Sequence, residues 1–295
     1  MIEVFNLRKE YGDFTAVEGS RFSVSEGEVF GVIGPNGAGK TTTLKMLSGL
    51  IEPTSGTSRV AGYDARDPEM RTKLGFLPEE SPLYEDMTPL SYLSFFADLY
   101  DVPPETADER IDRTLDRLEL DHRDRRLGDM SKGMRRKVAI ARSLVNDPAV
   151  LVYDEPASGL DPLTTNYIIG FTRDLAASGK TVVFSAHNLF HVESICDRLV
   201  VMNEGCIVAR GSVEDIREEH GRTEYHVSTS VAVDGAVAEN GTYRRVVGSM
   251  DAVDETRELA AAAGGEVVDI RTHAPSLEDI FLDLSRDAPD AEERP

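Results

Sequence analysis

The sequence predicts an α/β fold with a mixed sheet core, an antiparallel β part and a helical part, followed by a small α+β domain. Three observations predict it. A glycine-rich run at 34–42 lies between a buried strand and a helix. Short apolar runs at 150–153 and 181–184 alternate with helical segments, as in parallel sheets with crossover helices. Near residue 218 the composition shifts to short strand candidates and an alanine-rich helix.

The most informative segment is Gly34-Pro35-Asn36-Gly37-Ala38-Gly39-Lys40-Thr41-Thr42, which fits the pattern G-x-x-x-x-G-K-[ST]. A buried strand (28–33) precedes it and an amphipathic helix (41–50) follows. Glycines let successive N–H groups turn toward an anion, and the helix N-terminus adds partial positive charge. Lys40 then reaches the β- and γ-phosphates and Thr41 binds Mg²⁺. A chance glycine turn is the alternative, but every defined position is filled, so we predict a nucleoside triphosphate site.

Length and composition bound the class of protein. The 295 residues suit one large domain, or one with a small appendage. No stretch approaches the ~20 apolar residues of a membrane span, and residues 1–5 do not begin a secretion signal. The two cysteines, Cys196 and Cys206, are spaced like neither a metal site nor a redox pair. We therefore expect a protein of the reducing cytosol.

The charge balance is strongly acidic, with 53 Asp plus Glu against 32 Lys plus Arg and a net charge of -21. Lysine stands only at positions 9, 40, 45, 73, 132, 137 and 180. Such a surface repels phosphate backbones, so we expect no nucleic-acid partner. It also tolerates very high salt, where charges are almost fully screened. We expect a halophile's protein, and an ordinary acidic cytosolic protein is the alternative.

The first half of the chain changes from strands to helices. Residues 1–26 alternate apolar and polar side chains, which predicts half-buried antiparallel strands. Residues 87–126 have helical periodicity, and Pro103-Pro104 separates two helices there. Another helix is predicted at 131–147.

The second half begins with continuous apolar runs at 150–153 and 181–184, which predict buried strands. A strand over 199–202, a turn at 203–205 and a strand over 206–209 form a predicted hairpin. The chain shows no internal repeat, so it holds one nucleotide-binding unit.

The C-terminal region has its own element pattern. Strands are predicted at 225–233, 243–248 and 266–271, and helices at 251–263 and 277–284, the last with Ser276 as N-cap. We predict a nucleotide-binding domain over 1–218, with a helical subdomain at about 87–147. A small regulatory or accessory domain follows over 219–286, with a mere packing appendage as the alternative, and a disordered tail over 287–295.

Further motifs follow the glycine loop in a set order. Asp154 and Glu155 end the strand at 150–153. An Asp there can hold Mg²⁺ through water, and a Glu directly after it can polarise an attacking water. Ser158-Gly159-Leu160-Asp161 comes next, and a later strand ends at His187. Met130-Ser131-Lys132-Gly133-Met134-Arg135-Arg136 precedes them.

This ensemble resembles the ATP-binding subunits of ABC transporters over about residues 1–218. It is most similar to cassettes of drug, sodium and bacteriocin-type exporters with a separate permease, in its single cassette and its closing stretch 277–281. The resemblance implies a P-loop NTPase ABC cassette fold, ATP and Mg²⁺ as cofactors, and ATPase activity.

The resemblance assigns roles near the phosphates. Tyr11 corresponds to the aromatic residue that stacks on adenine, with a plain surface aromatic as the alternative. Residues 34–42 hold the phosphates and Mg²⁺. Glu79 stands where the family usually has a Gln that senses the γ-phosphate and the metal. This departure keeps an oxygen ligand, and the alternative is a surface acid.

The resemblance also assigns roles to later motifs. Ser131 and Gly133 match the signature loop that contacts a γ-phosphate, although Met130, Lys132 and Met134 replace the commoner Leu, Gly and Gln. The alternative for Ser131 is an ordinary N-cap.

Two more positions complete the comparison. Asp161 resembles the residue that links the two sites of a dimer, and a turn Asp is its alternative. His187 resembles the switch histidine beside the γ-phosphate, and a structural histidine is its alternative. Glu155 and His187 are thus the expected catalytic pair, with Thr41, Glu79 and Asp154 at the metal.

Partners follow from the resemblance as well. The phosphate loop of one subunit faces the signature loop of another, so we expect a homodimer. We also expect an integral-membrane permease docked near the helix 90–99, which places the chain at the cytoplasmic face of the membrane, with export as the direction of transport.

A soluble ABC-type ATPase that remodels a cytosolic assembly is the alternative function. A G-protein-like switch is excluded because no Asn-Lys-x-Asp guanine reader occurs.

Overall fold

The computed structural model describes residues 1–186, 188–221, 223–273 and 276–286. The chain divides into two compact units, Met1–Val213 and Glu214 onward. The predicted boundary at 218, with the domain roles attached to it, stays a prediction.

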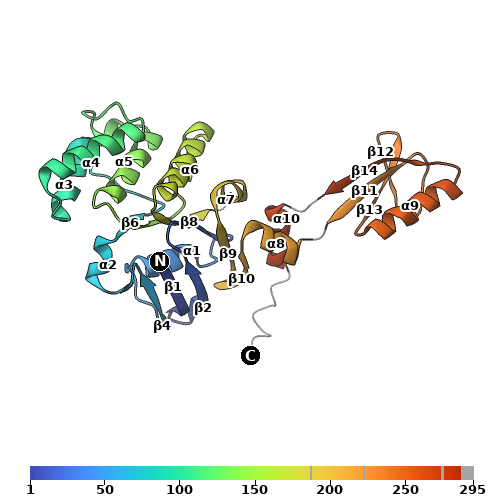
Figure 1. Cartoon of the computed structure of the whole chain (residues 1–295), viewed down its shortest axis with the longest axis horizontal. Helices are drawn as coiled ribbons and strands as arrows, with labels where there is room; N and C mark the ends of the chain where they lie inside the picture. The colour runs from blue at the N-terminus through green and yellow to red at the C-terminus, as the bar shows by residue number, and fades with distance from the viewer. Residues whose placement is uncertain (187, 222, 274–275, 287–295) are drawn as a thin grey trace. The chain divides into compact units, whose positions relative to one another are not determined.

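A mixed sheet of six strands, in the order β10-β9-β3-β8-β7-β6, forms the centre of the first unit (Figure 1). Neighbouring strands are parallel except β10, which pairs antiparallel with β9. The strands are β3 (Val29–Ile33), β6 (Leu74–Leu77), β7 (Val150–Tyr153), β8 (Thr181–Ala186), β9 (Arg198–Asn203) and β10 (Cys206–Gly211). Every residue of β3, β7 and β8 is buried, as expected of strands covered on both faces.

A second, antiparallel sheet has the order β2-β1-β4-β5. Its strands are β1 (Ile2–Tyr11), β2 (Phe14–Val24), β4 (Ser55–Val60) and β5 (Tyr63–Asp64). Phe22 of β2 stacks on Phe30 of β3 with ring centroids 5.2 Å apart. Both rings share one apolar cluster with Leu44 and Leu47 of the first helix, which are fully buried. This shared core joins the two sheets to that helix and so positions the loop before it.

The helices of the first unit are α1 (Lys40–Leu47), α2 (Pro68–Thr72), α3 (Pro89–Leu99), α4 (Pro104–Arg117), the 3₁₀ turn η1 (Leu127–Asp129), α5 (Lys132–Leu144), α6 (Pro162–Ala177) and α7 (Leu189–Ile195). Helices α3, α4 and α5 lie together at one end of this unit, away from the antiparallel sheet (Figure 1). Thr88 and Ser91 form a capping box that starts α3, and Pro104 occupies the first position of α4.

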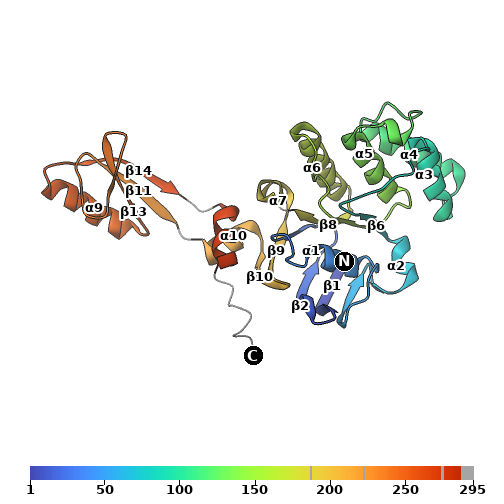
Figure 2. The same cartoon turned by 180° about the vertical axis from the view of Figure 1, so that it is seen from behind.

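The second unit is a four-stranded antiparallel sheet, in the order β12-β13-β11-β14, with α9 packed against it (Figure 2). Its elements are β11 (Glu224–Thr229), β12 (Val237–Glu239), β13 (Thr242–Val247), α9 (Met250–Ala262), β14 (Val267–His273) and α10 (Leu277–Arg286), and α8 (Val213–His220) begins at the division. Arg245 of β13 donates to the Thr256 hydroxyl of α9 at 3.0 Å. The Ser276 hydroxyl accepts from the backbone N–H of Asp279 at 3.1 Å, which confirms the predicted cap.

The predicted antiparallel start, buried strands, 199–209 hairpin and helices are confirmed, with shifted ends. The first helix ends at Leu47 and not at residue 50, because Gly49 adopts a left-handed φ of 64° after the cap. β11 ends at Thr229, short of the predicted 233, and β12 was not predicted. The predicted disordered tail lies outside the described residues. Within those residues, no helix combines the length and apolar character of a membrane span.

A matched pair of glycines tests how tightly β6 packs on α5. A Cβ at Gly75 of β6 would lie 2.1 Å from the Ser143 carbonyl oxygen, whereas Gly170 of α6 is exposed with open space around it. We expect Gly75→Ala to lower the free energy of unfolding by about 1–3 kcal/mol through overpacking. Gly170→Ala should be neutral or stabilise by up to about 1 kcal/mol, because alanine is the better helix residue. Urea unfolding measures both, and equal stabilities would contradict this packing.

Candidate active site

The glycine-rich loop runs from the end of β3 to the start of α1. Gly39, the N-cap of α1, has a left-handed φ of 97°, and a Cβ there would lie 2.5 Å from the Ala16 carbonyl oxygen. No other residue fits this position without moving the backbone. Among the described residues no side chain caps α1, so its first N–H groups stay available to an anion.

Lys40 is buried at the start of α1, and its ammonium donates to backbone carbonyls. Its Nζ lies 2.8 Å from the Gly34 oxygen and 3.1 Å from the Pro35 oxygen. Burial lowers the pKa of Lys40, while the nearby carboxylates of Glu155, Asp154 and Glu79 oppose that shift. The amine is thus held within the loop by neutral acceptors, close to three acids.

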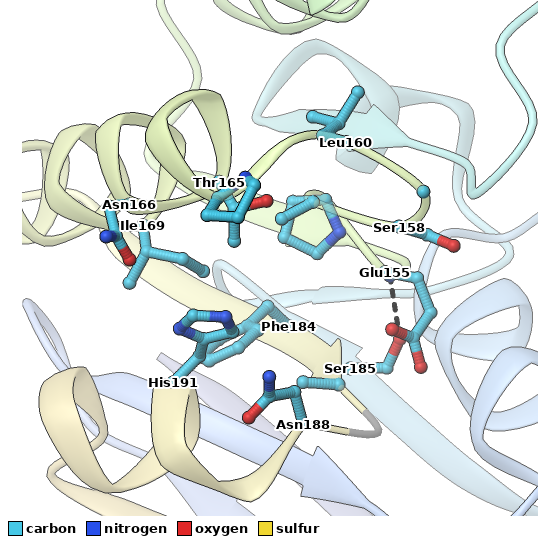
Figure 3. A pocket seen from close by; sticks show the side chains of 15 residues that line it. Glu155, Ser158, Leu160, Thr165, Asn166, Ile169, Phe184, Ser185, Asn188 and His191 are labelled. Atoms are coloured by element: carbon cyan, nitrogen blue, oxygen red, sulfur yellow. Dashed lines mark hydrogen bonds between the residues drawn. The ribbon is translucent and has the colours of Figure 1, made fainter.

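Two carboxylates follow directly after β7, as predicted. Asp154 is 1% exposed, and its Oδ1 accepts from the Ser185 hydroxyl at 2.6 Å. The same hydroxyl accepts from the backbone N–H of Glu155 at 2.9 Å (Figure 3). Ser185 of β8 therefore fixes both the Asp154 side chain and the Glu155 backbone.

Glu155 has an unusual backbone conformation. Its φ is 46°, in the left-handed region that residues other than glycine rarely adopt, and it is 8% exposed. A strained residue of this kind persists only where its surroundings hold it. The turn directs the chain away from β7 and leaves Glu155 on the wall of a cavity.

That cavity has a volume of about 560 Å³ and lies over the glycine loop. Glu79, after β6, also lines it, and its Oε1 accepts from the Ser158 hydroxyl at 3.4 Å. The lining residues are Phe14, Ala16, 35–42, Glu79, Glu155 and Ser158. The predicted phosphate loop, Glu79 and Glu155 thus meet at one cavity.

The predicted signature residues do not line this cavity. Ser131 is the exposed N-cap of α5, with its hydroxyl accepting from the Met134 N–H at 3.2 Å. A Cβ at Gly133 would lie 3.1 Å from the Thr164 methyl carbon. Within its own chain Ser131 therefore serves as a helix cap and does not reach the cavity over the phosphate loop.

Comparison with known proteins identifies the family. Residues 17–158 match the ABC transporter family. The Nod factor export ATP-binding protein I of Ralstonia nicotianae is 39% identical over 219 residues, which cover 73% of this chain and 68% of that protein. The linearmycin resistance ATP-binding protein LnrL of Bacillus subtilis is 35% identical, with 73% and 70% of the two chains covered. The chain belongs to the ABC transporter ATP-binding proteins.

Solved structures agree with this assignment. The ATP-binding subunit of an ABC transporter matches with a TM-score of 0.69 and 32% identity, covering 74% of this chain and 92% of that one. A dimeric, post-hydrolysis ATP-binding cassette bound to ADP and Pi matches with a TM-score of 0.66 and 25% identity, covering 72% and 98%. The predicted P-loop ABC cassette fold is confirmed, and the chain is an ATPase of this family.

The predicted adenine contact has two neighbouring aromatic residues. Tyr11 is 51% exposed, does not line the cavity, and has Lys9 Nζ 5.1 Å from its ring centroid. Phe14, its partner across the β1–β2 turn, does line the cavity and is 63% exposed. The role of Tyr11 stays a prediction, and Phe14 is a residue that sequence reasoning missed although it stands in the same turn.

Asp161 caps α6 in this ABC cassette. Its carboxylate accepts from the Thr164 N–H at 3.0 Å and from the Thr164 hydroxyl at 2.6 Å. These hydrogen bonds lower the pKa of Asp161. Its predicted role in linking two sites stays a prediction.

His187 lies outside the described residues. A second cavity of about 390 Å³ lies between α6, α7 and the ends of β7 and β8 (Figure 3). Glu155 and Ser185 stand on one side of it, and Asn166 and His191 on the other (Figure 3). Ser185 is a second missed residue, because a serine within an apolar strand carries no signal of its own.

The oxygen atoms that Thr41, Glu79 and Asp154 offer as ligands suit Mg²⁺. Magnesium is commonly bound by one or two carboxylates together with substrate phosphates and water, not by an all-protein cage. Thr41, Glu79 and Asp154 offer a hydroxyl and carboxylates near the phosphate loop. The described residues contain no cluster of three or more His, Cys, Asp and Glu that could hold a metal alone.

Aromatic substitutions test where the base lies. We expect the double variant Tyr11→Ala/Phe14→Ala to bind ATP about 10-fold more weakly, because stacking of a base on aromatic rings is worth ~1–3 kcal/mol. The two single variants divide that loss between the rings. Equilibrium binding of a fluorescent ATP analogue measures it, with inorganic triphosphate as a competitor that lacks the base. Wild-type affinity in the double variant would contradict a base at the β1–β2 turn.

Proposed function

We propose that this ATPase dimerises around two ATP–Mg²⁺ and powers a separate membrane permease, most simply as a homodimer and in the direction of export. Export is supported by the names of the relatives, which include Nod factor export and linearmycin resistance proteins. The structural neighbour described as a dimer supports the assembly.

One observation carries the dimer. The cavity contains the phosphate loop, Glu79 and Glu155, but the signature residues Ser131 and Gly133 stand elsewhere on the same chain. A hydroxyl and helix N-terminus suited to a γ-phosphate are therefore exposed and outside the cavity of the chain's own phosphate loop. A second copy, placed head to tail, would bring each signature loop to the other chain's cavity.

In this mechanism a water attacks the γ-phosphorus, the bond to the bridging oxygen breaks, and ADP and phosphate result. Glu155 accepts the proton of the attacking water, as its position on the cavity wall permits. Lys40 leaves the Gly34 and Pro35 carbonyls to contact the phosphates. Closure of the dimer adds the N–H groups and hydroxyl of the signature loop and excludes bulk water. His187 is proposed to orient the same water.

Mg²⁺, when bound by Thr41, Asp154 and Glu79, would neutralise charge on the phosphate oxygens. Glu79 supplies a full negative charge where the family usually has an amide, so this site offers the cation one more carboxylate.

Mixing inactive variants tests the shared site. Lys40→Ala disables the phosphate loop, and Ser131→Arg blocks the signature loop. If each site needs both chains, their mixture recovers up to about a quarter of the wild-type ATPase rate, because half of randomly assembled dimers carry one intact site. Rates are measured after subunit exchange without nucleotide.

A matched mixture is the control. Lys40→Ala and Glu155→Gln both damage the same half of the site, so their mixed dimer has no intact site and stays inactive. Recovery in the control mixture, or no recovery in the first mixture although mixed dimers form, would refute a site shared between chains.

The proposed permease contact is an aromatic cluster formed by α3 and by Tyr84 in the segment before it. Tyr84, Tyr92, Phe95 and Phe96 form it, with neighbouring ring centroids 4.9–6.0 Å apart. Tyr84 and Phe95 are 55% and 39% exposed. Leu99, also on α3, is 62% exposed. Exposed apolar surface of this kind suits a helix of a membrane subunit that reaches into the cytoplasm.

Charge substitutions test that contact. We expect Tyr84→Asp/Phe95→Asp to lose co-purification with the permease, while the isolated ATPase rate stays within about twofold, because neither ring lines the cavity. Phe5→Asp, on β1 and also 55% exposed, is the control and should keep the complex. A complex that survives the double substitution would exclude this surface.

The second unit is proposed as a small regulatory or accessory domain. Helix α9 packs on the sheet of that unit, which supports a separate domain with a core of its own. The acidic, lysine-poor composition supports function at high salt.

A further inference from the structure

Arg136 of α5 is a buried cation, and its hydrogen-bond acceptors among the described residues are all uncharged oxygens. It is 8% exposed and lies five residues after Ser131. Nε donates to the Pro156 carbonyl at 2.7 Å, Nη1 to those of Pro78 (2.7 Å) and Glu79 (2.9 Å), and Nη2 to those of Glu155 (2.8 Å) and Asp154 (3.1 Å). Nη1 also lies 3.3 Å from the Ser81 hydroxyl.

These acceptors belong to two segments that leave the sheet side by side. Leu77 of β6 pairs with Tyr153 of β7, and past these residues the parallel ladder ends. Carbonyls buried there need other donors, because an unpaired buried polar group costs ~1–3 kcal/mol. One guanidinium supplies donors to both segments, so it holds the main chain at Glu79 against the main chain at Asp154 and Glu155.

Arg136 also donates to the carbonyl of Glu155, the residue with the strained backbone. Glu155 keeps its left-handed φ of 46° with its N–H bonded to Ser185 and its carbonyl bonded to Arg136. Such a conformation requires support from several directions. Burial lowers the pKa of Arg136 to about 10, so the guanidinium stays charged at neutral pH and its hydrogen bonds stay charge-assisted.

We infer that Arg136 is a positioning residue for hydrolysis, which holds the backbone of Glu79, Asp154 and Glu155 in the geometry that water activation needs. The inference rests on the proposed roles of those three acids. Arg136 does not itself line the cavity and reaches it only through the main-chain carbonyls of Glu79 and Glu155, so its loss should affect the chemical step and the metal more than nucleotide affinity.

A lysine cannot replace this contact in full. Its ammonium is a compact group with three donors, whereas the planar guanidinium spans carbonyls of both segments with five. Lysine keeps the charge and some hydrogen bonds, so a partial recovery relative to glutamine is expected.

The test compares Arg136→Gln and Arg136→Lys with wild type in the full-length protein. We expect kcat for ATP hydrolysis to fall about 10- to 100-fold in Arg136→Gln, since misplacement by ~1 Å can cost that much. Arg136→Lys should fall between. The Kd of a fluorescent ATP analogue in EDTA should stay within about threefold, while the tightening produced by Mg²⁺ shrinks, because the Asp154 and Glu79 carboxylates are displaced.

Arg110 provides the matched control. It is a half-buried arginine of α4 that donates to the Val145 carbonyl and does not line the cavity. Arg110→Gln should leave kcat and the Mg²⁺ effect within about twofold, whatever it does to thermal stability. If Arg136→Gln does not fold, Arg136→Lys takes its place, and its kcat must fall while its Kd in EDTA stays within about threefold.

The outcomes separate the two proposals. A kcat within twofold of wild type in Arg136→Gln, or a Kd in EDTA that rises in step with the fall in kcat, overturns the positioning role. Glu155→Gln is measured alongside. Wild-type turnover in Glu155→Gln overturns the proposed role of Glu155 and this inference with it, whereas an inactive Glu155→Gln beside an active Arg136→Gln overturns this inference alone.

Discussion

Parallel pairing of β3, β8 and β7 is the constraint on which the site depends. Ile33 pairs with Ala186, and Tyr153 pairs with Phe184, so the three strands end at one edge of the sheet. The glycine loop leaves from the first strand and Asp154 from the third, while Ser185 stands on the strand between them. Ligand sites of open α/β sheets form at this carboxyl edge for the same reason. The apolar cluster around Leu44 and Phe30 keeps α1 against that edge.

At this edge of the sheet the Lys40 ammonium is bonded to uncharged groups, which it can leave to meet a phosphate. Lys40 is bonded to the neutral carbonyls of Gly34 and Pro35, although Glu155, Asp154 and Glu79 are near enough to act on its pKa. An ion pair with one of these acids would have to be broken before Lys40 met a phosphate, and partly buried pairs are costly to separate. Neutral acceptors are exchanged for phosphate oxygens more readily.

Local patterns made much of this structure predictable. The glycine loop, the buried strand before Asp154 and the 199–209 hairpin are each encoded within about ten neighbouring residues, and each is confirmed. The pairing of β1 with β4 joins positions some fifty residues apart, and the periodicity of a sequence does not show which distant strand is the partner.

The roles of Phe14, Ser185 and Arg136 were missed for a related reason. Their residue types are ordinary at a turn, in a strand and on a helix, and only the fold brings them to the cavity or its support. The resemblance to ABC cassettes named Ser131 and Asp161, whose side chains form helix-cap hydrogen bonds within the part of the chain that the structure describes.

Helix α5 connects the two halves of the proposed dimeric site. Ser131 caps its start, and Arg136, five residues later, lies about 7.5 Å further along the axis at the ~1.5 Å rise of an α-helix. The end of the helix that would contact the other chain's γ-phosphate is thus rigidly joined to the guanidinium that supports this chain's own carboxylates. Any tilt of α5 on dimer closure would therefore displace the carbonyls of Glu79 and Glu155 through short, charge-assisted hydrogen bonds. Because coupling between binding equilibria is reciprocal, metal and nucleotide held by these acids would in turn bias the orientation of Ser131 toward the partner. Arg136 is the element through which both sites could act on one equilibrium.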